Sequence, residues 1–448
     1  MGTVSRLFPF GGTCNNYEWG RKGSKSLAAR LCAASPETDF KIDEEKRYSE
    51  MWFGDYPNFP GRLGNGRPLG DALREHKNEL LGEHSVGKWG DQLPYLPKVS
   101  QPETAHHGTL PPQTRTNQTR GDQILSIAKA LPLQVLPNKD LAAKLHTQNP
   151  EQFTDPNHKP EIAIALSHFE LFAGWKELDE IAQLFRTPFL RGVMPPSAAS
   201  SSRWTDETLR EVVRALLKAD ADSVRAMQAE LAVQLEADFK KGGAHRASHL
   251  LRVLRDLQAQ CTDLDPGALV AVLCMNFLTL DPGEAIFIPA DGVHCYLSGD
   301  VFECMARSDN MLAGGLCPAA DRDHADVFCD ALRFGDLTRP RGIRLPAQTV
   351  RDPATGLVDH NAARFAPPVG EFDVLRVALL AGREQALRPA RGPTVAIVLR
   401  GEGTLVGDDD DDGREVRLMQ GQIFFVAANT AATVRATGDL ELYATVGG

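Results

Sequence analysis

One histidine stands where it could bind a metal ion. The segment from Leu280 to Pro318 begins with a Pro-Gly turn at 282–283 and an apolar run from Ala285 to Pro289. An Asp-Gly pair then precedes His294, which begins a second extended run. Short apolar runs bounded by Pro-Gly and Asp-Gly predict two short antiparallel strands joined as a hairpin. A histidine at the open end of such a hairpin can face the inside of a β-barrel, where imidazole is a common metal ligand.

The residues of this segment also resemble a known family. The segment contains PGEA at 282–285, HCYLSGD at 294–300, ECMA at 303–306 and SDN at 308–310. In this order the blocks closely resemble the type I phosphomannose isomerases. That family interconverts mannose 6-phosphate and fructose 6-phosphate and uses a zinc ion bound in a cupin, a small jelly-roll β-barrel. The resemblance implies that His294 is a zinc ligand, and that the pocket is lined by Tyr296, Glu303 and Asp309, which position the substrate or relay protons.

Two blocks in the first half of the chain supply the rest of the implied site. LPLQVLPNK at 131–139 and DPNHKPEIAIAL at 155–166 are similar to family segments that carry a glutamine and a glutamate bound to zinc. The resemblance therefore makes Gln134 and Glu161 the other two ligands and places Lys159 in the pocket.

An earlier strand resembles the family as well. LPYLPKV at 93–99 is similar to a strand whose lysine, here Lys98, lies in the active site. The aromatic clusters YEWG at 17–20 and SEMWFG at 49–54 resemble N-terminal signatures of the family, although alone they indicate only strand ends that pack on a core.

The implied residues suit the chemistry of an aldose–ketose isomerase. An amide oxygen, a carboxylate and an imidazole form a mixed donor set for one zinc ion per chain, or for a similar divalent ion, with an open position. Such an enzyme needs a cation that polarises the carbonyl, a base that moves a proton between C1 and C2, and cationic groups that hold the phosphate.

Several positions depart from the family pattern. Leu136 stands where the family has a fourth ligand, a histidine, and Ala313 and Ala319 stand where it has an arginine and a lysine. Pro132 and Asn138 are milder changes at positions that do not bind metal. Two functions therefore stay open: a mannose-6-phosphate isomerase that feeds GDP-mannose synthesis, or an impaired family member that binds a sugar phosphate or a partner. A storage or structural bicupin would leave the NHKPE and SDN blocks unexplained.

Composition bounds the kind of protein. The 448 residues are 42% hydrophobic and 24% charged, with a net charge of −10, which is typical of a soluble globular chain and argues against nucleic acid or an anionic membrane as a partner. The eight cysteines have no CxxC spacing, which predicts reduced thiols. No secretory signal or long apolar run is evident, so we expect a cytoplasmic monomer that acts on a small sugar phosphate.

The periodicity of the chain predicts three domains in a mainly β fold with an α-helical insertion. Residues 1–175 with 266–335 form a catalytic cupin domain, and residues 176–265 form an all-helical domain. Residues 336–448 repeat the glycine and apolar pattern of the first barrel but lack its histidine, which predicts a second jelly-roll barrel that binds no metal. Residues 100–123 interrupt the family pattern with loop composition; they are either a solvent loop or a stretch that the mature transcript does not encode.

Overall fold

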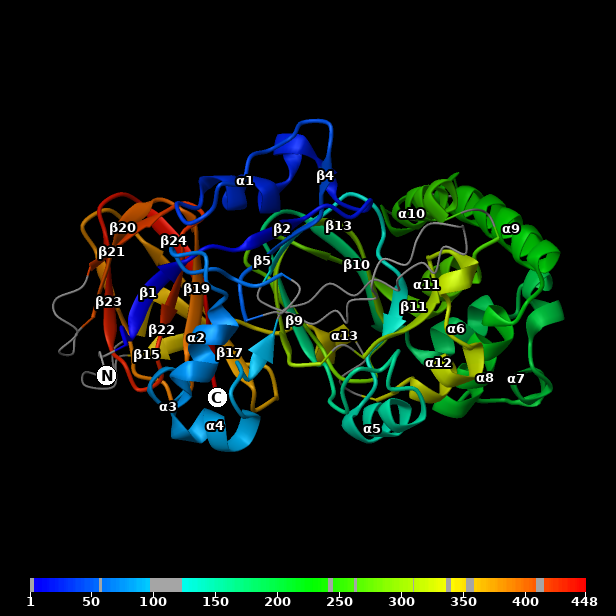
Figure 1. The fold of residues 1–448 in the computed structure, drawn as a ribbon. Helices are drawn as coiled ribbons and strands as arrows, with labels where there is room; N and C mark the ends of the chain where they lie inside the picture. Colours follow the sequence, from blue (N-terminus) through cyan, green and yellow to red (C-terminus); the bar gives the residue numbers. More distant parts are fainter. Residues whose placement is uncertain are drawn as a thin grey trace, which may run out of the picture.

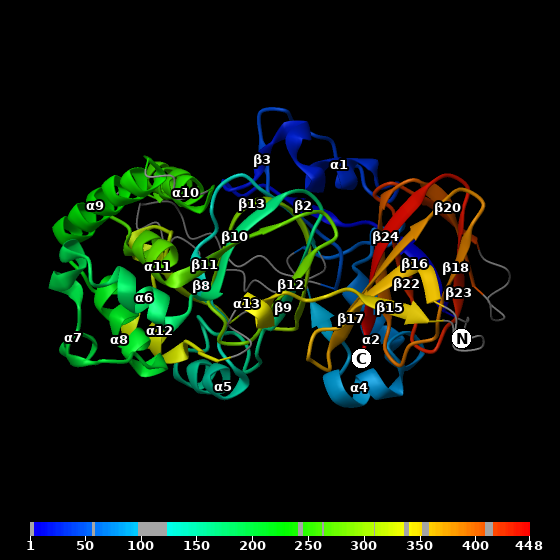
Figure 2. The same ribbon diagram turned by 180° about the vertical axis from the view of Figure 1, so that it is seen from behind.

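The computed structural model describes residues 4–55, 59–96, 123–240, 245–261, 264–308, 310–335, 340–351, 358–407 and 415–448. A strand-rich region lies in the middle of the molecule, with a helical layer on one side and a second strand-rich region on the other (Figures 1 and 2). Both termini lie beside the second strand-rich region.

The central region is an 11-stranded sheet organised around one long strand, β13 (His294–Ala306). This strand pairs with five others, and Gly299, at φ 131°, allows it to bend beside a bulge opposite β10. A Cβ on Gly299 would lie 2.7 Å from the His168 carbonyl oxygen, so only glycine fits there. The other strands are β2 (Thr13–Asn15), β5 (Glu50–Trp52), β6 (Tyr95–Leu96), β7 (Gln123–Ile127), β8 (Leu133–Val135), β9 (Glu161–Ala165), β10 (Phe169–Trp175), β11 (Met275–Leu280), β12 (Ala285–Ile288) and β14 (Leu312–Gly315).

The two strands predicted around His294 are present as β12 and β13, but the predicted pairing between them is wrong. β12 pairs with β9, and its Ile288 lies opposite Glu161, while β13 begins opposite Gln134 of β8. The connection from Pro289 to Val293 carries the chain to another part of the sheet instead of reversing it. Asp291 adopts φ 64° in this connection.

Helices cover one side of the central sheet. They are α6 (Leu178–Leu184), η2 (Pro188–Val193), α7 (Pro196–Ser200), α8 (Asp206–Leu217), α9 (Ala221–Lys240), α10 (His245–Cys261), α11 (Pro266–Cys274) and α12 (Ala325–Ala331). The prediction of helices over 176–265 is confirmed, and Thr205 begins α8 by accepting a hydrogen bond from the backbone N–H of Thr208. The stretch from Pro196 to Ser200 forms α7, and the helical region also extends beyond 265 through α11.

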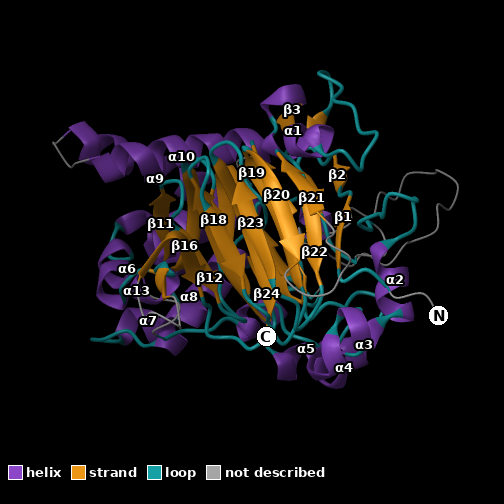
Figure 3. Cartoon of the chain, turned by 90° about the vertical axis from the view of Figure 1, so that its left-hand side faces the viewer, coloured by secondary structure: helices purple, strands orange, loops and turns teal. Residues whose placement is uncertain are grey.

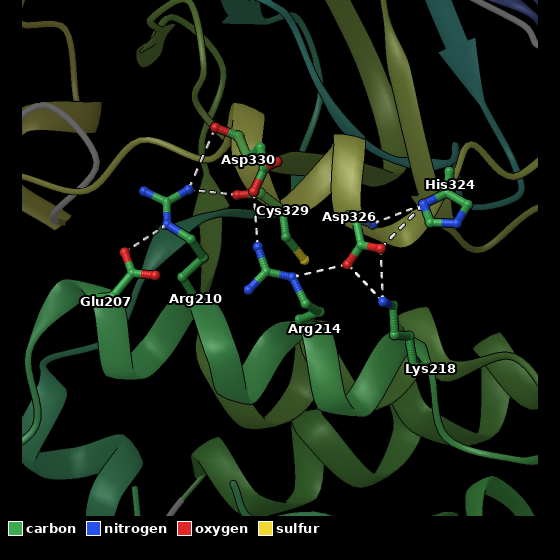
Figure 4. Close-up of polar contacts among 8 residues, drawn as sticks. All are labelled: Glu207, Arg210, Arg214, Lys218, His324, Asp326, Cys329 and Asp330. Carbon is green, nitrogen blue, oxygen red and sulfur yellow. Dashed lines mark hydrogen bonds and ion pairs between the residues drawn. The ribbon is translucent and has the colours of Figure 1, made fainter. Parts of the chain in front are cut away.

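A polar seam joins α8 to α12 (Figure 4). Arg214 lies 3.1 Å from Asp326 and 2.8 Å from Asp330, and Lys218 lies 2.6 Å from Asp326. Because α12 packs against β14, this seam ties the helical layer to the central sheet.

The second strand-rich region consists of two sheets packed face to face (Figure 3). The first contains β1 (Leu7–Phe10), β22 (Ile423–Val426), β19 (Thr394–Arg400), β24 (Leu440–Gly447), β17 (Phe372–Leu379), β16 (Val358–Phe365) and β15 (Gln348–Arg351). The second contains β18 (Glu384–Leu387), β23 (Ala432–Ala436), β20 (Glu402–Gly407) and β21 (Glu415–Met419). The N-terminal strand β1 joins the C-terminal region through β22, a pairing that the sequence did not indicate.

Short elements complete the fold: β3 (Arg21–Lys22), η1 (Gly23–Lys25), α1 (Leu27–Ala34), β4 (Arg47–Tyr48), α2 (Leu69–Glu75), α3 (Lys77–Leu80), α4 (Gly82–Trp89), α5 (Lys139–Gln148), η3 (Ala319–Asp321) and α13 (Pro340–Ile343). With them the protein is mixed α and β, with a larger helical share than the predicted mainly β class. The eight cysteines are free thiols, as predicted. No helix among the described residues is long and apolar enough to cross a membrane.

Candidate functional site

The predicted metal ligands converge inside the central sheet because side chains alternate along each strand. On β8, Leu133 and Val135 pack toward the helical layer, so Gln134 faces the opposite way. On β9, Ile162 and Ile164 pack toward the C-terminal sheets, which turns Glu161 inward.

His294 is directed inward by the same alternation. Its neighbour Cys295 packs toward the helical layer, and His294 itself lies opposite Gln134 in the register of the two strands. The Gln134, Glu161 and His294 side chains are all buried, with at most 3% of each residue exposed.

The geometry of these three side chains fits a cation. His294 Nδ1 lies 3.1 Å from the Gly292 carbonyl oxygen, which can only accept, so Nδ1 carries a hydrogen. In the neutral imidazole Nε2 then has a lone pair, and it lies 3.4 Å from Glu161 Oε2 and 2.9 Å from Gln134 Nε2. A lone pair and a carboxylate this close in a buried site repel each other unless a proton or a metal ion lies between them.

Few side chains near this point could ligate a metal ion. Among the described residues, no group of three or more His, Cys, Asp and Glu side chains could hold a metal, so an ion bound at this point would need an oxygen of Gln134 as its third donor. Turning its amide by half a revolution presents the oxygen in place of the nitrogen. Three protein donors with a remaining open position are typical of catalytic zinc.

Lys159 supplies positive charge beside this centre. Its Nζ lies 3.3 Å from Glu161 Oε1, and the side chain is 1% exposed. Burial raises the pKa of Glu161, but Lys159 and His294 together outweigh burial and leave that pKa below its usual range. Glu161 is therefore a carboxylate at neutral pH.

Tyr296 and Glu303 lie against the same interior. The Tyr296 ring centroid is 5.4 Å from that of His294 and 5.1 Å from that of Phe169. Burial raises the pKa of Tyr296 well above its ordinary value, and Glu303 and Glu161 raise it further, so the hydroxyl keeps its proton. Glu303 is 2% exposed.

Two predicted site residues, Lys98 and Asp309, lie outside the described residues, as do 100–122 of the anomalous segment. The neighbours of Asp309 have structural contacts: the Ser308 hydroxyl donates to the Asn157 carbonyl oxygen at 2.8 Å, and the Asn310 amide donates to the Asp155 carbonyl oxygen at 2.6 Å. The SDN block thus fixes the loop that leads into Lys159 and Glu161.

The positions that depart from the family pattern lie in different surroundings. Leu136 is fully buried in the apolar cluster that also contains Tyr296, and Ala313 is the register partner of Gln134 and fully buried. Ala319 is exposed. Asn138 accepts a hydrogen bond from the Leu141 N–H at the start of α5 and donates its side-chain N–H to Asp291 at 2.6 Å, so it has a structural role.

Sequence reasoning missed Glu50 as a titratable group. Its neighbours Met51 and Phe53 pack toward the C-terminal sheets, so Glu50 faces the other way, where it accepts a hydrogen bond from Asn15 at 2.8 Å. Burial raises its pKa to about 8. The signal was present in SEMWFG, where a carboxylate directly precedes a run of apolar and aromatic residues and so indicates more than a strand end.

Fold and centre together define a class: a protein with a buried Gln–Glu–His centre inside an antiparallel sheet, flanked by helices. Solved structures of Salmonella typhimurium mannose 6-phosphate isomerase share this fold, with a TM-score of 0.76 and 22% identity over 99% of this chain and 100% of that one. One of them is bound to its substrate and to a zinc atom.

Comparison with protein families is more specific. The model of the phosphomannose isomerase type I catalytic domain matches residues 7–113 and 121–178. The mannose-6-phosphate isomerase of Cryptococcus neoformans is 31% identical over 96% of both chains, and that of Ogataea parapolymorpha is 30% identical over 96% of this chain and 95% of that one. The chain belongs to the type I phosphomannose isomerase family.

Proposed function

We propose that the protein is a zinc-dependent mannose-6-phosphate isomerase, an aldose–ketose isomerase that interconverts mannose 6-phosphate and fructose 6-phosphate. The observation that carries the proposal is the convergence of Gln134, Glu161 and His294, from three strands, on one buried point. Bound there, zinc would polarise the substrate carbonyl.

The side chains around the centre have separate roles in this proposal. Gln134, Glu161 and His294 hold the metal, and Lys159 keeps Glu161 ionised and adds positive charge that stabilises an enediolate. Glu303 takes the proton at C1 or C2, and Tyr296, whose hydroxyl stays protonated, donates a hydrogen bond to a substrate oxygen. Lys98 and Asp309 are assigned to the same pocket by the family resemblance alone.

In this proposal the domains of the chain have separate roles. Residues 1–175 with 266–335, apart from β1, form the catalytic unit, a cupin barrel; 176–265 form a helical domain; and 336–448, joined by β1, form a second barrel, whose described residues include no cluster of metal ligands. The protein acts as a cytoplasmic monomer on a sugar phosphate, binds neither nucleic acid nor membrane, and feeds GDP-mannose synthesis.

An impaired family member was the alternative, because of Leu136 and Ala313. The comparisons do not support it, since relatives of about 30% identity over nearly the whole chain are named as the isomerase.

A coupled assay with mannose 6-phosphate tests the proposal, together with metal analysis. We expect about one zinc per chain and measurable isomerisation, both lost in Glu161→Gln. Arg344→Gln, which removes an exposed ion pair to Glu284, should leave both unchanged. A wild-type protein that carries zinc but does not isomerise the substrate would refute the assignment.

A further inference from the structure

A basic hollow lies on the surface formed by the N-terminal elements β3, η1, α1 and β4. Its volume is about 620 Å³, and it is lined by Arg21, Lys22, Ser24, Lys25, Arg30, Arg47 and Ala128. Five of these seven residues are cationic, whereas Lys and Arg make up 49 of the 448 residues of a chain with a net charge of −10. The concentration of positive charge therefore needs an explanation beyond composition.

Two of the cationic side chains are exposed to solvent and can bind a ligand directly. Lys25 and Arg30 make no ion pair with any residue that the structure describes, and both are exposed. Each could bond an anion in the hollow without first losing a protein partner.

Two further cations have partners that are easily replaced. Lys22 lies 2.6 Å from Glu45, and Arg47 lies 3.6 Å from Glu18. The two carboxylate side chains are 84% and 86% exposed, so an incoming anion can displace them into water at little cost.

The fifth cation is fixed in place. Arg21 lies 3.2 Å from Asp300, whose side chain is 9% exposed, and donates to the Ile127 carbonyl oxygen at 3.4 Å. These contacts anchor one wall of the hollow to β13 and to the end of β7, so the wall is rigid before any ligand arrives.

The hollow is separate from the Gln134–Glu161–His294 centre. None of the seven residues that line the hollow is assigned to that centre or to the pocket around it.

We propose that this hollow is a second ligand site, which binds a small anion bearing phosphate groups. Ammonium and guanidinium groups that line one open hollow can form charge-assisted hydrogen bonds with phosphate oxygens, and the arginine fork suits phosphate geometry. A local cluster of this kind overrides the negative charge of the whole chain at short range because salt screens distant charges within about 10 Å.

Inorganic pyrophosphate is the probe, with binding to the full-length protein measured by calorimetry at an ionic strength of about 0.1 M. The test variant is the double change Lys25→Ala with Arg30→Ala. The matched control is Lys41→Ala with Lys144→Ala, which removes the same charge from two exposed lysines that do not line the hollow. We expect the test variant to weaken binding about tenfold or more and the control to change it less than about twofold.

Three results would overturn the proposal. They are absence of pyrophosphate binding to the wild type, an equal loss in the test and control variants, and a loss in Lys159→Met without a loss in the test variant. The last result would place the anion at the central site instead of in the hollow.

A second arm identifies the source of the phosphate groups. Mannose 6-phosphate is titrated against pyrophosphate bound to the Lys159→Met variant. Displacement that depends on Lys25 and Arg30 assigns the hollow to sugar phosphates, and absence of displacement assigns it to diphosphates; both results support a phosphate site.

Discussion

Leu136→His is the sharpest test of the candidate metal centre. Leu136 follows Gln134 by two residues, so the two side chains share a face, and it is fully buried in the cluster with Tyr296. An imidazole at this position would give the ion a fourth donor.

The expected loss of folding stability follows from the burial of Leu136. Without metal, the change removes a buried apolar side chain, worth about 1.5–3 kcal/mol, and buries an unpaired polar group at a cost of about 1–3 kcal/mol. We therefore expect the metal-free variant to unfold about 2.5–6 kcal/mol more easily than the wild type. With zinc bound, most of this loss should return, because the imidazole then has a partner.

The assay is urea unfolding with and without zinc, together with zinc affinity measured by competition with a chelator. Zinc should bind at least about tenfold more tightly to the variant than to the wild type. Leu136→Phe is the control, since it introduces a ring without a lone pair and should show no gain in zinc affinity. If Leu136→His is destabilised equally with and without zinc and its zinc affinity is unchanged, then position 136 does not face the ion and our placement of the centre is wrong.

Three other predictions concern stability. Glu50 has a folded-state pKa of about 8 against an ordinary value of 4.5, so the folded state binds the extra proton and stability falls as pH rises from about 4.5 to 8. Glu50→Gln should remove this fall, by a few kcal/mol at pH 8, as measured by unfolding at pH 5 and pH 8; parallel pH profiles of the two proteins would contradict it. Thr205→Ala should cost about 1 kcal/mol in urea unfolding because α8 loses its cap, with Thr205→Ser close to the wild type; equal losses in both would show that the hydroxyl does not cap the helix. Arg214→Ala should cost less than about 1 kcal/mol despite its two ion pairs, since those pairs are solvent-exposed, and a larger loss would show that the seam to α12 is a major contact.

Local sequence patterns predicted much of the fold. The Pro-Gly and Asp-Gly turns marked the ends of β12 and the start of β13. The blocks around Gln134, Glu161 and His294 indicated which side chains form the centre. These signals are short-range, because turn geometry, helix capping and side-chain alternation depend on residues a few positions apart.

Other features depended on contacts between distant segments. The sequence did not indicate that β12 pairs with β9, that β1 joins β22, or that Ala313 lies opposite Gln134. The burial of Glu50 likewise results from the packing of distant segments. The basic hollow is lined by Arg21, Arg30 and Arg47, which come from separate elements of the fold.

The sequence by itself determined the family of this protein and indicated the candidate side chains of its centre, since residue type and local spacing carry both signals. Only the tertiary structure showed which strands pair, which carboxyl groups are buried away from water, and where lysine and arginine side chains cluster on the surface. The physical reason is that strand pairing and desolvation are set by the whole packed core, and no short window of sequence contains that core.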